Sequence, residues 1–139
     1  MAEPASVYVL DSFALLAYFQ AESGGPAVLA LVEAARDQQA GLHLSLINAG
    51  EMYYLVHRQK GRERAETLLR DLRELPILLE PVSEERVWAA ARLKAAHAMS
   101  YSDAFAAALA QELNATLVTG DLEFKSVEGI VRILWLARK

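Results

Sequence analysis

The stretch YSDAFAAALAQELNATLVTGDLEF, residues 101–124, combines a helix pattern and a strand pattern in one short segment. Its alanine-rich first half predicts a helix with side chains small enough to lie close to a sheet, and the apolar run TLVT predicts a buried strand. An aspartate lies near each end, Asp103 and Asp121, and no lysine or arginine lies between them. The stretch therefore predicts a helix–strand core unit with two carboxylates that have no local cation.

The same alternation of patterns continues outward through the chain. Short apolar runs predict strands at residues 7–10, 42–45, 77–80, 116–119 and around 130–136. Helix patterns separate them at residues 12–22, 27–40, 47–60, 62–75 and 85–98. Short apolar strands that alternate with helices are typical of a parallel sheet covered on both faces. The sequence therefore predicts an α/β fold, a three-layer α/β/α sandwich with a central parallel sheet of about five strands, in a single domain of residues 1–139.

Composition excludes several classes of protein. The chain has no cysteine, which excludes disulfides, thiolate metal sites and cysteine nucleophiles and is compatible with a reducing cytoplasm. No apolar run approaches the roughly 18 residues that span a bilayer, and residues 1–6 (MAEPAS) lack the basic region of a signal peptide. We therefore expect a cytoplasmic protein outside the membrane. The net charge of −4 means that any binding of nucleic acid needs a local basic patch.

Four acids lie at or near the carboxyl ends of predicted strands. Asp11 ends the first strand, and Glu51 lies one turn into the helix after the second. Asp103 opens the alanine-rich helix, and Asp121 follows the fourth strand. Ligands of open parallel sheets bind beyond the carboxyl ends of the strands, so these side chains belong to the edge where a site is expected.

Each acid also has a purely structural interpretation. Asp11 has the position of a helix N-cap, and Asp121 follows a glycine as a turn residue does. The pairs Asn48–Glu51 and Ser100–Asp103 have the form of capping boxes. For any single acid, this interpretation is the stronger one.

Taken together, the acids favour a metal site. No lysine or arginine precedes Arg36, and none lies between Lys94 and Lys125. Several carboxylates at one sheet edge repel each other and lose hydration, and a hard divalent cation such as Mg²⁺ offsets both costs. A bound ion of this kind supports metal-assisted hydrolysis. No G-x-S-x-G, Walker A or H-E-x-x-H pattern competes with this hypothesis, and we expect the scattered His43, His57 and His97 to have surface or core roles.

Three motifs, in this order, resemble the PIN domain, and specifically the VapC-type toxins of prokaryotic toxin–antitoxin pairs. The motifs are VLDSFALLAYF (9–19), SLINAGEMYYL (45–55) and SYSDAFAAALAQELNATLVTGDLEF (100–124), and the similarity covers nearly the whole chain. The resemblance implies a ribonuclease that depends on Mg²⁺ or Mn²⁺. It also implies a five-stranded parallel sheet, a homodimer, and a small antitoxin protein that holds the toxin inactive.

The resemblance carries the catalytic and metal-binding roles of the family onto four matching acids, which are Asp11, Glu51, Asp103 and Asp121. It places Thr119 as the polar residue that precedes the last aspartate, with Ser12 and Asn48 as supporting groups. All four acidic positions match, which argues against an inactive, binding-only relative.

A basic segment offers a place for RNA. HRQKGRER (57–64) contains Arg58, Lys60, Arg62 and Arg64, which could contact phosphates without reading sequence. A solvated helix face, balanced by neighbouring acids, is an equal alternative. Tyr53 and Tyr54 could stack bases or an antitoxin side chain, although packing in a core or dimer is favoured. For Trp88 and Trp135 we expect core or interface positions.

Two further functions remain open. A housekeeping PIN nuclease in RNA processing or decay is one, although a chain of this size without an added RNA-binding module favours the toxin. A receiver-like, magnesium-binding signalling domain is the other, but it needs an aspartate after the third strand, where the sequence has Glu80 and Pro81. The leading prediction is therefore a toxin endoribonuclease that uses metal-activated water.

Overall fold

Five parallel strands form the central sheet of the computed structural model, which describes residues 6–138. Their order across the sheet is β3-β2-β1-β4-β5. The strands are β1 (Ser6–Leu10), β2 (Ala40–Ser45), β3 (Ile77–Glu80), β4 (Thr116–Thr119) and β5 (Ile133–Trp135). All four strand pairs are parallel, which confirms the predicted sheet. The prediction that no signal peptide is present falls on residues 1–5, which lie outside the described residues.

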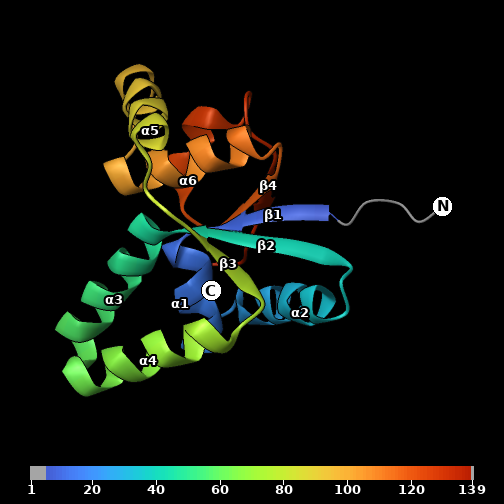
Figure 1. Cartoon of the computed structure of the whole chain (residues 1–139), viewed down its shortest axis with the longest axis vertical. Coiled ribbons are helices and arrows are strands. Elements are labelled where there is room, and N and C mark those ends of the chain that lie inside the picture. Colours follow the sequence, from blue (N-terminus) through green and yellow to red (C-terminus); the bar gives the residue numbers. More distant parts are fainter. Residues whose placement is uncertain (1–5, 139) are drawn as a thin grey trace.

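Helices cover both faces of the sheet, as Figure 1 shows. They are α1 (Ser12–Phe19), α2 (Gly25–Arg36), α3 (Leu46–Lys60), α4 (Arg62–Glu74), α5 (Glu84–Ala96), α6 (Tyr101–Glu112) and the 3₁₀ helix η1 (Leu122–Val127). In this view α5 and α6 lie above the sheet, and α1, α2 and α4 lie below it. The predicted three-layer α/β/α architecture is therefore confirmed.

Alternating side chains of the central strands separate two hydrophobic cores. Val9 and Leu117 pack with α5, α6 and η1, whereas Leu10 and Val118 pack with α1 to α4. Successive strand residues face opposite sides of a sheet, so β1 and β4 serve both cores. Every residue from Asp103 to Ala110 is buried, because the alanines let α6 lie directly against the sheet.

The strand order places a topological switch point between β1 and β4. From β1 the chain passes to β2 on one side, and β4 lies on the other side. Open α/β sheets bind ligands at such a switch point, beyond the carboxyl ends of the strands. In Figure 1 these ends point to the left, between the α3–α4 pair and the α5–α6 pair.

Two helices end three or more residues earlier than the sequence predicts. α1 stops at Phe19 and α2 at Arg36, because Ala21 and Gln38 adopt left-handed backbone angles (φ 52° and 60°) that a right-handed helix does not contain. Ala40 consequently belongs to β2. The helix η1 was not predicted. Its turns begin directly after Asp121, where the sequence suggested only a turn.

Two aromatic predictions have different outcomes. Trp88 is 52% exposed, so it lies outside the core, whereas Trp135 packs partly against the α5–α6 core. None of the helices within residues 6–138 has both the length and the apolar character needed to cross a membrane.

Candidate metal centre

Asp11 ties the carboxyl ends of β1 and β4 together. As the N-cap of α1, it accepts a hydrogen bond from the Ala14 amide at its Oδ1 (2.9 Å). Its Oδ2 accepts a hydrogen bond from the Thr119 hydroxyl (2.5 Å), and both residues are buried. The predicted cap is therefore correct, and Thr119 holds the second carboxylate oxygen across the switch point.

Glu51 joins three helices. Its Oε1 accepts a hydrogen bond from the Ser12 hydroxyl (2.7 Å), and its Oε2 accepts one from the Ser102 hydroxyl (3.1 Å). These bonds link α3 to the first turns of α1 and α6. Ser12, a predicted supporting group, thus orients Glu51 rather than Asp11.

The predicted capping box from Asn48 to Glu51 is wrong. The N-cap of α3 is Ser45, whose hydroxyl accepts a hydrogen bond from the Ile47 amide, so Asn48 lies inside the helix. Asn48 is fully buried, and its Nδ2 donates to the Ser102 carbonyl (3.1 Å). Its Oδ1 has no hydrogen-bond partner among residues 6–138. Asn48 therefore fixes the start of α6 beside the acids.

The second predicted capping box is half correct. Ser100 is the N-cap of α6, and its hydroxyl accepts a hydrogen bond from the Asp103 amide (3.2 Å). The Ser100 amide donates to Glu123 Oε1 (3.2 Å) instead of to the Asp103 carboxylate. The box therefore leaves the Asp103 carboxylate available for other contacts.

Asp103, Asp121 and Glu123 bring their carboxylates together beside the switch point, where Asp103 is buried, Asp121 half-buried and Glu123 exposed. One oxygen from each lies within 4.8 Å of the other two. Asp121 is the N-cap of η1 and accepts the Glu123 amide at Oδ1 (2.9 Å), while its own amide donates to Thr119 Oγ1 (3.0 Å). We call the five acids Asp11, Glu51, Asp103, Asp121 and Glu123 the acidic cluster.

Sequence reasoning missed Glu123. It considered only acids at strand ends and in the first turns of predicted helices, and η1 was not among those helices. The signal was the D-x-E spacing in GDLEF, which places the second acid one short 3₁₀ turn from the first.

A close packing contact positions the loop between Thr119 and Asp121. A Cβ atom on Gly120 would lie 2.4 Å from the ring of Phe13, far inside van der Waals contact. Only glycine therefore lets the Phe13 ring lie against this loop without displacing it.

Burial and mutual repulsion dominate the electrostatics of the acidic cluster. Burial raises the pKa of Asp11 to about 7, with further increases from Asp121 and Glu51, against the hydrogen bonds from Thr119 and Ala14. Burial also raises the pKa of Asp103 to about 7, and the charges of Asp121 and Asp11 add to it. The native site thus resists carrying all its negative charges at once.

Cations do not balance the acidic cluster within residues 6–138. The three ion pairs found there involve only Glu80 and Glu112, not the acids of the cluster. The donor set consists of oxygens and carries several negative charges, which is the chemistry that Mg²⁺ and Mn²⁺ prefer. The residues therefore fit a hard divalent cation.

The predicted basic residues lie apart from the acidic cluster. Arg58, Lys60, Arg62 and Arg64 are all exposed, at the end of α3 and the start of α4. In Figure 1 this helical hairpin projects away from the sheet, at the lower left. The structure thus brings the four predicted acids together and leaves the four basic residues on a neighbouring surface.

Comparison with known proteins gives a family match and a set of similar folds. Residues 8–130 match the model of the PIN domain family. Curated proteins yield no match. A chain of VapBC2 from Rickettsia felis, bound to a DNA fragment from its promoter, is 20% identical, with a TM-score of 0.72 over 94% of this chain and 99% of that one.

Two further solved structures have the same fold. DNA-bound VapBC from Salmonella typhimurium is 16% identical, with a TM-score of 0.71 over 93% of this chain and 97% of that one. VapC20 from Mycobacterium tuberculosis, described as a sarcin–ricin loop cleaving toxin, is 17% identical, with a TM-score of 0.70 over 88% of this chain and 95% of that one. At these identities the likeness concerns the fold.

Proposed function

The chain belongs to the PIN domain family, and from this premise we propose that it is a divalent-metal-dependent endoribonuclease, the toxin of a type II toxin–antitoxin pair. The observation that carries the proposal is the convergence of five carboxylates at the β1–β4 switch point without a cationic partner among residues 6–138. The VapC fold of the similar structures supports the toxin assignment.

In this proposal the acidic cluster holds Mg²⁺ or Mn²⁺. The bound ion would lower the pKa of water and neutralise charge that develops on the phosphate during hydrolysis. Thr119 and the Ala14 amide fix both oxygens of Asp11, and two serines fix both oxygens of Glu51. These side chains would therefore keep their positions, because ligand orientation depends on such supporting hydrogen bonds. Asp121 and Glu123 are the more exposed of the three neighbouring carboxylates, so the phosphate would approach from their side.

The proposed partners are RNA and an antitoxin protein. Exposed Arg58, Lys60, Arg62 and Arg64 would contact the phosphates that flank the scissile one. The two DNA-bound structures described above are VapBC complexes, which supports a cognate antitoxin for this chain. The proposed location of both proteins is the cytoplasm. We also propose that the protein forms a homodimer and that residues 1–139 make up a single domain.

Cleavage mapping on total RNA tests this function. Purified protein with Mg²⁺ or Mn²⁺ is expected to cut RNA at defined internal sites, and excess chelator or Asp11→Asn to abolish the cuts. Undiminished cleavage under either condition would disprove the metal mechanism. Growth arrest on expression without the antitoxin is the matching test in cells, since harmless expression of an active enzyme contradicts the toxin role.

A further inference from the structure

One side of α3 carries a line of functional side chains outward from the acidic cluster. Glu51, Tyr54 and Arg58 are three and four residues apart, the spacing that places side chains on neighbouring positions of one helix face. Tyr54 and Arg58 are both exposed, whereas the opposite face of α3, with Met52 and Val56, is buried. The line therefore runs along the open surface of the helix.

Tyr54 and Arg58 are paired with each other and with nothing else among the described residues. The Arg58 guanidinium carbon lies 5.2 Å from the centre of the Tyr54 ring, in a cation–π contact. Tyr54 is nevertheless 46% exposed. Its neighbour Tyr53 differs. The Tyr53 hydroxyl donates to Glu66, which links α3 to α4, and the Tyr53 ring packs against His57. Packing accounts for Tyr53 but not for Tyr54.

The surface around this pair is suited to a negatively charged chain. Lys60, Arg62 and Arg64 continue the exposed cations past Arg58, and within residues 6–138 no carboxylate lies within ion-pair distance of any of the four. A strand with a phosphate at the acidic cluster that followed α3 past Tyr54 would reach Arg58 first and then the cations of the α3–α4 turn. Charge complementarity therefore disfavours a second copy of this face, and the exposed Tyr54 ring beside the cations favours nucleic acid, whose bases can stack, over an acidic peptide.

We propose that Tyr54 and Arg58 form a stacking platform for an unpaired RNA base next to the scissile phosphate, an inference that rests on the proposed ribonuclease function. Bases of single-stranded RNA stack on aromatic rings and guanidinium planes, whereas a duplex hides them. Tyr54 follows Glu51 by about 4.5 Å along the helix axis. Successive nucleotides of a stacked strand are about 3.4 Å apart, so the platform would take the base directly beside the cut.

The test measures RNA binding separately from cleavage. In an Asp11→Asn background with Mg²⁺, fluorescence anisotropy would follow a labelled ten-nucleotide single strand and its duplex. Tyr54→Ala is expected to weaken single-strand binding roughly ten-fold. Tyr54→Phe keeps the ring and should bind within about two-fold of the parent, whereas Tyr54→Leu keeps apolar area without a ring and should resemble Tyr54→Ala. Duplex binding should change little in all three.

A control and a salt titration isolate the platform. Trp88→Ala removes another exposed aromatic residue, on α5, and should leave binding unchanged. Arg58→Ala removes the cationic half of the platform, so it should weaken single-strand binding and also reduce the slope of log affinity against log salt by about 0.7, whereas Tyr54→Ala should preserve that slope.

Single-strand binding by Tyr54→Ala equal to the parent would overturn the inference. If the oligomeric state changes at the same time, Tyr54 is a protein-contact residue instead. Cleavage by the wild type separates the two proposals. If it cuts RNA and Tyr54 is immaterial, only the platform fails. If Tyr54 governs binding and no divalent-dependent cleavage occurs, only the ribonuclease proposal fails.

Discussion

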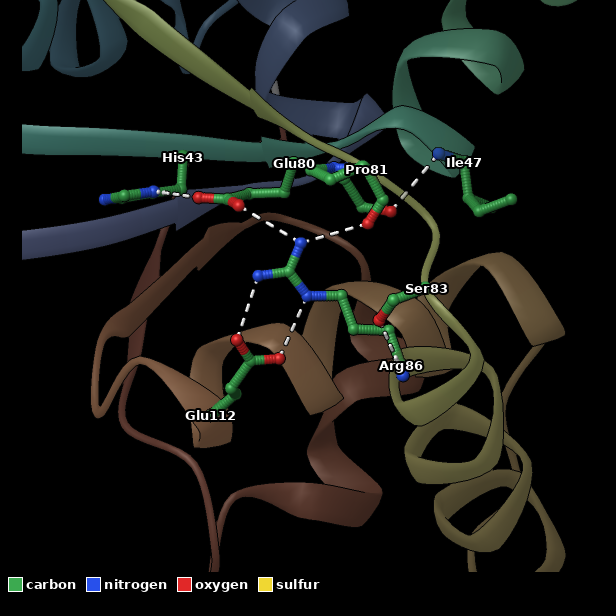
Figure 2. Close-up of polar contacts among 8 residues, drawn as sticks. His43, Ile47, Glu80, Pro81, Ser83, Arg86 and Glu112 are labelled. Atoms are coloured by element: carbon green, nitrogen blue, oxygen red, sulfur yellow. Dashed lines mark hydrogen bonds and ion pairs between the residues drawn. The ribbon is translucent and has the colours of Figure 1, made fainter.

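Two groups of acids each include a residue at the carboxyl end of a strand, and the groups differ in whether cations accompany them. The acidic cluster gathers around the ends of β1 and β4. At the end of β3, Glu80 is held by His43 Nδ1 (2.6 Å) and by Arg86 (3.1 Å), and Arg86 also forms two hydrogen bonds with Glu112 (3.0 and 2.9 Å). We call His43, Glu80, Arg86 and Glu112 the β3 network; Figure 2 shows Arg86 between its two carboxylates.

The difference shows what distinguishes a structural acid from a site acid. Glu80 is as buried as members of the acidic cluster, so burial alone does not mark function. In the β3 network the hydrogen bond from Arg86 lowers the pKa of Glu112, whereas burial without a cation raises the pKa of Asp11 and Asp103 to about 7. The β3 network supplies its own positive charge, and the acidic cluster leaves that charge to a bound ion.

The largest expected effect is on catalysis by the acidic cluster. Asp103→Asn removes one charge from the close group of three carboxylates without changing its shape, and we expect RNA cleavage in Mg²⁺ to fall at least roughly a hundred-fold. Because repulsion is also relieved, circular dichroism should show an intact fold. Glu112→Gln in the β3 network is the matched control and should cleave within about two-fold of wild type. Equal losses in both variants would erase the functional distinction.

The next effect is on stability and should be confined to the β3 network. Arg86→Ala leaves Glu80 buried without its arginine, which we expect to lower the free energy of unfolding by about 3 kcal/mol in urea titrations. Arg92→Ala removes an exposed arginine from the same helix and should change it by less than about 0.5 kcal/mol. A loss below about 1 kcal/mol for Arg86→Ala would mean that the network adds little to the fold.

The contrast also explains how far the sequence could predict this molecule. The sequence predicts Asp11 and Ser100 as caps because capping depends on residues two or three positions apart, and the strand pattern places Asp11 and Thr119 at one edge; for Asp121 it predicts only a turn. The β3 network was not predicted, since His43 and Glu80 are 37 positions apart and Arg86 and Glu112 are 26 apart. No local spacing encodes such pairs. The pairing of β2 with β3 brings His43 to Glu80, and the packing of α5 against α6 brings Arg86 to Glu112.

Asn48 and Glu123 show two further limits of sequence reasoning. Asn48 imitates a capping box, but the helix starts earlier because Ser45 supplies a cap directly at the end of β2. Glu123 joins the acidic cluster only because η1 turns it back toward Asp121 and Ser100. In both cases the residue at which a helix begins decides the role of the side chain. Helix ends are the part of a pattern that a sequence predicts least reliably.

A further consequence is a pH dependence of stability in the metal-free protein. The pKa values of Asp11 and Asp103 are raised to about 7, so between about pH 4 and pH 7 the native state binds more protons than the unfolded chain. The free energy of unfolding contributed by these groups therefore falls as pH rises through this window. In chelator, the melting temperature should drop by several degrees from pH 5 to pH 8, and Mg²⁺ should restore it at pH 8.

The double variant Asp11→Asn, Asp103→Asn isolates these two carboxyls from other titrating groups. It should show a flatter pH profile and a weaker response to Mg²⁺ than the wild type. An unchanged profile would place the pH dependence in other groups of the molecule.

The smallest expected effect defines the boundary of the acidic cluster at Glu123. Glu123→Gln removes the charge but keeps an oxygen that can accept the Ser100 amide, so α6 should retain its start. We expect the Mg²⁺ concentration for half-maximal cleavage to rise roughly ten-fold, with a smaller change in the maximal rate. An exposed acid at the rim attracts the cation more than it orients the other ligands.

Glu128→Gln, beyond η1 and hydrogen-bonded to Trp135, is the control and should leave both quantities unchanged. An unaltered Mg²⁺ requirement for Glu123→Gln would restrict the site to the four acids that the sequence predicted. Glu123 would then resemble the acids of the β3 network, whose side chains hold the fold in place.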